Sequence, residues 1–254
     1  MKRIVLAGVG LAVLSVTANA ADLGSRRRQP VVAPVAMAPA FTWTGIYAGV
    51  NAGYAWNSGN DWRTRGDAAS LAYAGAGNFP YSTSFSRGGF VGGGQLGANY
   101  QIGRFVVGAE TDIMGLGSSK KSNFWLASGT YGTFKDSSSW LGTTRVRLGF
   151  TPVDNLLIYG TGGAAYGNVK HSAFVVSPGA GGTWAGSKSD TKFGWALGAG
   201  AEYAFTNNIT GRLEYLYYDL GRTNVALGTA AGASPVMRAE NRGNLVRAGL
   251  NYKF

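Results

Sequence analysis

Alternation of apolar and polar residues with a period of two is the feature that most constrains this chain. Between residues 46 and 56, Val50 and Tyr54 share an apolar face, whereas Asn51 and Gly53 lie on the other face. Successive side chains of a β-strand point to opposite faces, so this pattern predicts a half-buried strand. Seven more stretches repeat it, at 88–101, 104–116, 139–151, 156–168, 191–205, 209–221 and 241–254.

Composition supports an all-β fold and excludes several functional classes. The 254 residues include 41 glycines, each of which costs about 1 kcal/mol relative to alanine in a helix. There is no cysteine and one histidine, which excludes disulfide scaffolds, thiolate nucleophiles and cysteine-based metal sites. With aromatic residues at 13% and charged residues at 14%, the chain is also far from a disordered composition.

Residues 1–20 have the organisation of a secretory signal peptide. A positive start is followed by an apolar run too short for a membrane helix, which needs about 20 residues. Small residues at its end predict cleavage between Ala20 and Ala21. Loss of Lys2 and Arg3 would lower the net charge from +11 to +9.

Residues 21–40 read as a Pro/Ala-rich periplasmic leader that precedes the folded domain. Three prolines within 29–40 favour an extended, polyproline-like segment. The leader carries three arginines at 26–28, but the other basic residues are scattered through the chain. Export and this scatter argue against a nucleic-acid partner, and they favour an acidic lipid or polymer of the envelope.

The connections between the predicted strands alternate in length. Short connections occur around 102–103, 152–155 and 206–208, and long ones at 57–87, 117–138, 169–190 and 222–240. In an up-and-down barrel this alternation places all long loops at one end and all short turns at the other. That arrangement is the anatomy of outer-membrane barrels.

The position of the charges decides between a water-soluble and a membrane barrel. In the last strand, Val246, Leu250 and Phe254 share one face, and Arg247 and Asn251 share the other. A soluble eight-stranded barrel fills its interior with apolar side chains, whereas a membrane barrel turns them towards lipid.

Aromatic residues mark both edges of the apolar band: Tyr100, Phe105, Phe150, Phe205 and Phe254 at one edge, and Trp56, Phe90, Trp140 and Trp195 at the other. We therefore predict, over residues 41–254, an eight-stranded antiparallel up-and-down transmembrane β-barrel with a polar interior.

Charged residues on the polar faces are predicted to form an ionic network inside the barrel. Buried charges must be paired, or each costs several kcal/mol. The four acids and four arginines of this network are Glu110, Asp112, Arg145, Arg147, Glu202, Arg212, Glu214 and Arg247.

Two other motifs suggest chemistry more weakly. Residues 92–97 satisfy GxGxxG and Asp112 follows, but the next segment is a strand and not the helix that a dinucleotide site requires. His171 lies in a predicted long loop and is expected to be solvated. A metal or hemin site that combines it with loop tyrosines (Tyr73, Tyr81 or Tyr131) is the alternative, although one histidine is a poor metal site.

Several separated blocks carry a family resemblance. WTGIYAGVNAGYAW at 43–56, GGFVGGGQLGANYQ at 88–101, GRLEYLYYDLG at 211–221 and LVRAGLNYKF at 245–254 resemble the porin-family small outer-membrane β-barrel proteins of Gram-negative bacteria. These proteins are similar to the membrane domain of outer membrane protein A. The resemblance implies an outer-membrane location and the role of an envelope protein and surface antigen. It also implies that Phe254, with Tyr252 and Leu250 on the same face, is the signal recognised by the barrel-assembly machinery.

The function expected from these features is structural and non-enzymatic, with a role in envelope integrity and surface interaction, and without a cofactor. The alternative is a low-conductance porin. The narrow interior of an eight-stranded barrel, which is just wide enough for side chains, favours the structural role over this alternative. The expected partners are outer-membrane lipids and lipopolysaccharide, and the barrel is expected to be a monomer. Basic residues of the predicted loops suit the phosphates of lipopolysaccharide: Arg63, Arg65, Lys120, Lys121, Lys170, Lys188, Arg222 and Arg238.

Overall fold

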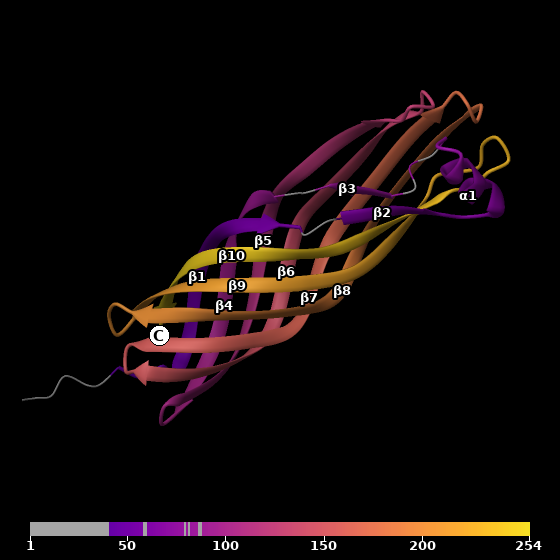
Figure 1. The fold of residues 1–254 in the computed structure, drawn as a ribbon. Coiled ribbons are helices and arrows are strands. Elements are labelled where there is room, and N and C mark those ends of the chain that lie inside the picture. The colour runs from indigo at the N-terminus through magenta and orange to yellow at the C-terminus, as the bar shows by residue number, and fades with distance from the viewer. Residues whose placement is uncertain (1–40, 58–59, 79, 81, 86–87) are drawn as a thin grey trace, which may run out of the picture. The chain divides into compact units, whose positions relative to one another are not determined.

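The computed structural model describes residues 41–57, 60–78, 80, 82–85 and 88–254 (Figure 1). The predicted signal peptide and leader therefore lie outside the described residues. The strands are β1 (Gly45–Trp56), β2 (Asn60–Arg65), β3 (Ser82–Phe85), β4 (Gly88–Ile102), β5 (Phe105–Trp125), β6 (Tyr131–Val153), β7 (Leu156–Ser177), β8 (Gly182–Ala204), β9 (Ile209–Ala226) and β10 (Val236–Lys253). The helix α1 (Ala68–Gly75) lies between β2 and β3.

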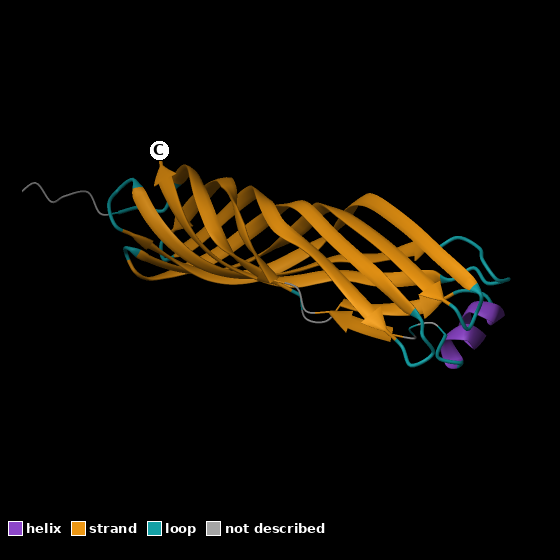
Figure 2. Cartoon of the chain, turned by 90° about the horizontal axis from the view of Figure 1, so that it is seen from above, coloured by secondary structure: helices purple, strands orange, loops and turns teal. Residues whose placement is uncertain are grey.

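Eight of these strands close into a ring. Strands β4 to β10 pair in chain order, and β1 joins β4 to β10, so that Val50 lies opposite both Gly94 and Leu250. All the pairings are antiparallel, which confirms the predicted eight-stranded up-and-down barrel (Figure 2). A closed ring has no free sheet edge, so the strands satisfy one another's backbone hydrogen bonds.

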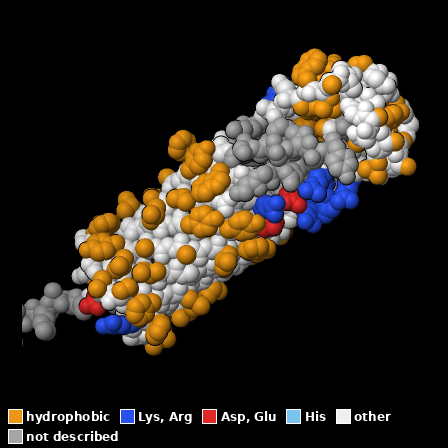
Figure 3. All heavy atoms as spheres, in the orientation of Figure 1, with side chains coloured by type: hydrophobic (Ala, Val, Ile, Leu, Met, Phe, Trp, Pro, Cys, Tyr) orange, Lys and Arg blue, Asp and Glu red, His pale blue; other side chains and the backbone are white. Residues whose placement is uncertain are grey.

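An apolar belt covers the outside of the ring. Each of its strands has an outward apolar side chain that is 53–64% exposed: Val50, Leu96, Ile113, Leu148, Ile158, Leu197, Leu213 and Leu250. On the face of the barrel that Figure 3 shows, apolar side chains are spread over much of the surface. Such a belt is unfavourable in water and favourable in lipid. Within the described residues, no helix is long and apolar enough to cross a membrane.

Aromatic residues border this belt at both ends, as predicted. Near the short turns, Phe105 and Phe150 have ring centroids 5.6 Å apart. At the other edge, Trp195 lies 5.4 Å from Tyr217, and Trp140 lies 6.1 Å from Tyr166. Bands of aromatic side chains are typical of the depth at which lipid headgroups meet acyl chains.

The prediction of loops at 117–138, 169–190 and 222–240 is wrong for most of their length. Strands β5 to β8 are 21–23 residues long, about twice what a membrane-spanning strand needs. The strands therefore continue beyond the belt into a structure that we call the extension, which comprises residues 117–138, 169–192, 220–242 and the described part of 60–85. Many of its outward positions are polar, for example Lys170 and Ser172, and this polarity resembles the composition of a loop.

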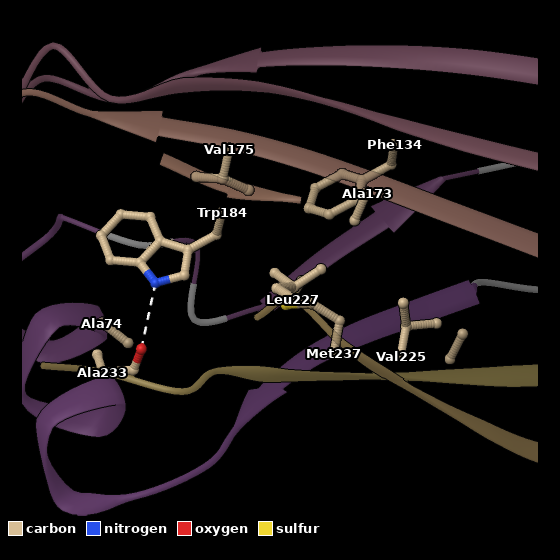
Figure 4. Packing of buried hydrophobic residues seen from close by; sticks show 10 residues of the cluster. Ala74, Phe134, Ala173, Val175, Trp184, Val225, Leu227, Ala233 and Met237 are labelled. Carbon is tan, nitrogen blue, oxygen red and sulfur yellow. Dashed lines mark hydrogen bonds between the residues drawn. The ribbon is translucent and has the colours of Figure 1, made fainter. Parts of the chain in front are cut away.

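The extension has an apolar core of its own. Phe134, Val175, Trp184, Leu227 and Met237 are at most 1% exposed and pack together inside it (Figure 4). The Trp184 indole also donates a 3.4 Å hydrogen bond to the Ala233 carbonyl. Burial of these side chains explains why the strands remain paired outside the belt.

The segment at 57–87, predicted to be a loop, also contributes to the extension. Its β2 pairs with the first residues of β10, with Arg65 opposite Val236 and Arg63 opposite Arg238. Its helix α1 buries Ala74 against the apolar core. The Asp67 carboxylate caps α1, because its Oδ1 accepts hydrogen bonds from the Ser70 amide at 2.8 Å and the Ser70 hydroxyl at 2.6 Å.

We expect Asp67 to hold α1 in place at neutral pH. The hydrogen bonds from Ser70 lower the pKa of Asp67, so its stabilising effect is present above the unfolded-state pKa and is lost as pH falls through the folded-state value. Asp67→Ala should therefore speed amide exchange of residues 68–75 at neutral pH. The difference from wild type should shrink in acid, as followed by mass spectrometry at matched pH, and equal exchange at neutral pH would contradict this assignment.

Candidate functional site

The ionic residues of the barrel interior meet halfway along the barrel axis. The strand register itself brings opposite charges together: Glu110 lies opposite Arg145, Glu202 opposite Arg212, and Glu214 opposite Arg247. Cross-strand pairs of opposite charge stabilise a sheet. Each of the eight residues predicted for the network is at most 4% exposed: Glu110, Asp112, Arg145, Arg147, Glu202, Arg212, Glu214 and Arg247.

Arg145 and Arg247 share the same three carboxylates. Arg145 lies 2.9 Å from Glu110, 2.7 Å from Asp112 and 2.9 Å from Glu214. Arg247 lies 2.5 Å from Glu214, 3.1 Å from Asp112 and 3.5 Å from Glu110. Each carboxylate is thereby held by at least two guanidiniums, which offsets the cost of removing these charges from water.

Arg147 and Arg212 extend the network towards the short-turn end. Arg147 is paired with Glu202, and Arg212 with Glu110. Two tyrosines outside the predicted set complete the network. The Tyr47 hydroxyl donates to Glu110 at 2.7 Å, and the Arg147 guanidinium lies 3.6 Å from the centre of the Tyr159 ring, which is a cation–π contact.

A chain of uncharged polar side chains continues from Glu202. Its Oε1 accepts hydrogen bonds from the Thr210 hydroxyl at 2.5 Å and from the Asn251 amide at 2.8 Å. Gln95 donates to Asn251 at 2.7 Å and accepts from Asn51 at 2.5 Å. The period of two predicts that these polar side chains point inward. It does not predict their hydrogen-bond partners, which lie on other strands.

Apolar layers close the interior on both sides of the ionic layer. Towards the extension lie Met114, Leu141, Leu216 and Leu245, which are at most 1% exposed. Towards the short turns lie Trp43, Val106 and Leu157, which are at most 2% exposed. The predicted polar interior is thus the middle layer of a filled lumen, and the apolar layers were not foreseen.

Trp43 occupies the short-turn end of the lumen. Its backbone amide donates to the Gln101 side chain at 2.8 Å, and its indole donates to the Asp154 carbonyl at 3.0 Å. These two bonds tie the start of the described chain to two of the short turns. Trp43 therefore closes this end of the barrel.

Glycine opposite arginine makes room for the ionic layer. Gly53 lies opposite Arg247, and a Cβ atom there would come within 2.1 Å of the Val246 carbonyl oxygen and 2.7 Å of the Arg247 Cα. Gly163, opposite Arg145, is equally crowded, with 2.3 Å to the Thr144 oxygen. Side chains at these positions would compete with the arginines for the narrow lumen.

A family comparison agrees with this architecture. Residues 9–254 match the family model described as outer membrane protein beta-barrel domain. The chain belongs to this family. A location in the outer membrane follows from this family and from the apolar belt, which a barrel in that membrane turns towards lipid.

Named relatives of this outer-membrane barrel span its whole length. The 31 kDa outer-membrane immunogenic protein of Brucella melitensis biotype 1 is 42% identical over 258 residues, covering 100% of both chains. The 25 kDa outer-membrane immunogenic protein of Brucella abortus biovar 1 is 30% identical, covering 100% of this chain and 99% of its own. Among solved structures, OprG of Pseudomonas aeruginosa has a TM-score of 0.53 at 12% identity and covers 84% of this chain and 98% of its own, which shows a shared fold.

His171 does not lie in a solvated loop, so that expectation is wrong. It is an inward residue of β7, 0% exposed, and its Nε2 lies 2.8 Å from the Asn241 Oδ1. Tyr131 instead faces outward and stacks on Trp125 at 5.1 Å, while Tyr81 lies outside the described residues. No cluster of three or more metal-binding side chains occurs within the part of the barrel that the structure describes.

Removing one guanidinium should destabilise the barrel strongly. Arg145→Met leaves three carboxylates short of a partner, and breaking a buried ion pair from one side costs about 3–5 kcal/mol. The control Arg104→Met lies at an exposed turn and should have little effect. Urea unfolding in lipid vesicles measures both free energies of unfolding. Equal values for the two variants would contradict the inferred role of the ionic layer.

Proposed function

We propose that this outer-membrane barrel is a sealed structural protein of the envelope that presents its extension at the cell surface. The observation that carries the proposal is the filling of the lumen. An ionic layer lies between two apolar layers, and Trp43 closes the short-turn end. Eight strands fix a narrow interior, whereas water-filled porins use about 16–18 strands.

The same side chains support a non-enzymatic role without a cofactor. The acids of the ionic layer are held by arginines, so they are poorly placed to exchange protons with a substrate. His171 is buried in the extension and is hydrogen-bonded to Asn241. A hemin or metal site built on this histidine would require the extension to open, which does not favour that alternative.

The relatives' names support a surface-exposed role. Two Brucella relatives are called outer-membrane immunogenic proteins. In our proposal the extension is the part that antibodies reach, because it projects beyond the apolar belt. Its paired strands and apolar core make it a rigid epitope platform.

The chain terminus supports recognition by the barrel-assembly machinery. Leu250, Tyr252 and Phe254 are outward and 56%, 51% and 73% exposed. The Tyr252 and Phe254 rings lie 5.2 Å apart at the edge of the apolar belt. An accessible apolar edge of this kind is what a recognition signal on the last strand requires. The closed ring is compatible with a monomer in the membrane.

The purified barrel should give no steady conductance in a planar bilayer. Trp43→Ala should also stay closed, because the ionic layer and the other apolar layer remain in place. Single-channel recording measures this, with a gel shift on heating to verify that each barrel is folded. A stable pore of nanosiemens scale in the wild type would contradict the proposal and support the porin alternative.

Labelling of single cysteines should show which end faces outward. The natural chain has no cysteine, so Pro178→Cys at the extension and Asn207→Cys at a short turn each introduce one thiol at an exposed position. A membrane-impermeant maleimide should label Pro178→Cys on intact cells and Asn207→Cys only after permeabilisation. The reverse pattern would overturn the proposed orientation.

A further inference from the structure

The outer face of β5, β6 and β7 carries exposed aromatic side chains near the tip of the extension. Trp125, Tyr131 and Phe174 point outward and are 75%, 39% and 44% exposed. The Trp125 and Tyr131 rings are stacked, with centroids 5.1 Å apart and an angle of 23° between their planes. The turn that joins β5 to β6 lies at the opposite end of the barrel from the short turns (Figure 1). Large apolar groups that are exposed together in this way mark binding surfaces.

Three lysines lie beside these rings on the same side of the sheet. Lys121 and Lys135 are exposed and directly opposite each other, and Lys170 on β7 is exposed at a position diagonal to Lys135. None of the three forms an ion pair with another described side chain. Like charges directly opposite each other destabilise a sheet, so a bound anion between them would be stabilising. We call the six residues the aromatic–lysine face: Trp125, Tyr131, Phe174, Lys121, Lys135 and Lys170.

Hydrogen-bonding side chains lie between the rings and the lysines. The Thr133 hydroxyl donates to the Asn123 Oδ1 at 2.9 Å, and both residues belong to the strand positions between Trp125 and Lys121 or their partners on β6. This bond leaves the Asn123 amide group with both of its N–H donors. The face therefore offers a stacking platform, polar groups and cations in that order along the strands.

The size of the face suits a linear chain. Neighbouring strands are about 4.8 Å apart, and successive residues of one strand advance by about 3.3 Å. The face therefore extends roughly 10 Å across β5, β6 and β7 and roughly 13 Å along β5 from Lys121 to Trp125. A stable protein complex buries about 800 Å² on each partner, which is far more than this area.

The chemistry of the face suits a sugar chain better than a peptide chain. An extended peptide binds a sheet by pairing with a free strand edge. In the middle of this face, however, β6 is paired with β5 and β7, and β7 is also paired with β8. A pyranose ring needs no strand edge, because its apolar C–H face stacks on a flat aromatic group and its hydroxyls bind amides and hydroxyls. Trp125 and Tyr131 supply the aromatic groups, and Asn123 supplies the amide.

The lysines select an acidic chain. A lysine ammonium group is a point charge on a flexible stem, so it suits anionic groups that repeat along a chain. The face also lies well beyond the headgroups of the membrane. From Gly115, which is opposite Trp140 at the edge of the apolar belt, β5 continues for about 33 Å to Trp125. A chain that reaches this position comes from a surface facing the cell.

We propose that the aromatic–lysine face binds an acidic, uronic-acid-containing polysaccharide that is presented by a surface outside the cell. This rests on the proposed function, which places the extension outside the cell. The sugar rings stack on Trp125 and Tyr131, and the carboxylates lie among Lys121, Lys135 and Lys170. The bound carboxylates neutralise the like charges that the strand register places opposite each other.

The test compares the binding of hexagalacturonate with that of its uncharged methyl ester, by thermophoresis of the detergent-solubilised barrel. Wild type should bind the acid roughly tenfold more tightly than the ester, and added salt should reduce this preference. Lys121→Gln/Lys135→Gln/Lys170→Gln should bind the acid as weakly as the ester. Trp125→Ala should weaken the binding of both probes and keep the preference, because stacking does not depend on the carboxylates.

The extension supplies a matched control for the loss of charge. Lys188, Arg222 and Arg242 are 46%, 58% and 41% exposed on β8, β9 and β10, away from the aromatic–lysine face. Their exposed ion pairs contribute little to stability. Lys188→Gln/Arg222→Gln/Arg242→Gln removes the same charge as the other triple variant and should keep the wild-type preference for the acid. A gel shift on heating verifies the fold of each variant.

Four results would overturn the proposal: no preference for the acid in the wild type, an equal loss of preference in the control variant, unchanged binding in Trp125→Ala, or tighter binding of a polyglutamate peptide than of hexagalacturonate. The last result would assign the face to an acidic protein segment. Failure of the proposed function is read separately, from conductance and cysteine labelling. If those two measurements agree with a sealed, outward-facing barrel while the carboxylates have no effect, only the proposal for the aromatic–lysine face falls.

Discussion

Closure of the ring by β1 and β10 is the constraint on which the rest of the structure depends. In lipid, a backbone amide or carbonyl without a hydrogen-bond partner costs several kcal/mol, so the sheet must have no edge. Closure after eight strands sets a diameter that leaves room for side chains and little else. Inward residues in the middle of the barrel are then buried, and each inward charge there needs a partner.

The filling of the lumen follows from that diameter. Arg145 and Arg247 reach across it to carboxylates on several strands, and Gly53 and Gly163 leave the volume that these arginines occupy. Removal of one partner leaves the opposite charge buried and uncompensated. Breaking the ionic layer therefore costs more free energy than the intact ion pairs contribute to stability. In our proposal, a lumen filled in this way serves mechanical integrity and not transport, and the outer surfaces carry the interactions.

Beyond the apolar belt, the strands remain paired and enclose an apolar core. The strands of the extension bury Phe134, Trp184 and Met237, and β2 takes over the edge of β10 where β1 has ended. Side chains on paired strands have fixed spacings, unlike those on long loops.

The sequence by itself determined the position of the eight strands within the apolar belt, their inward and outward faces, and the charged set of the interior, since a period of two is a local property of the chain. It could also place Arg247 inward and Leu250 outward. Only the tertiary structure decided which charges meet, that Tyr47 and Tyr159 join them, and that apolar layers flank them. It also decided that His171 is buried, because the polar outward residues of the extension resemble a loop until its inward residues meet across the barrel. Contacts between strands distant in sequence depend on ring closure, and no local pattern encodes that.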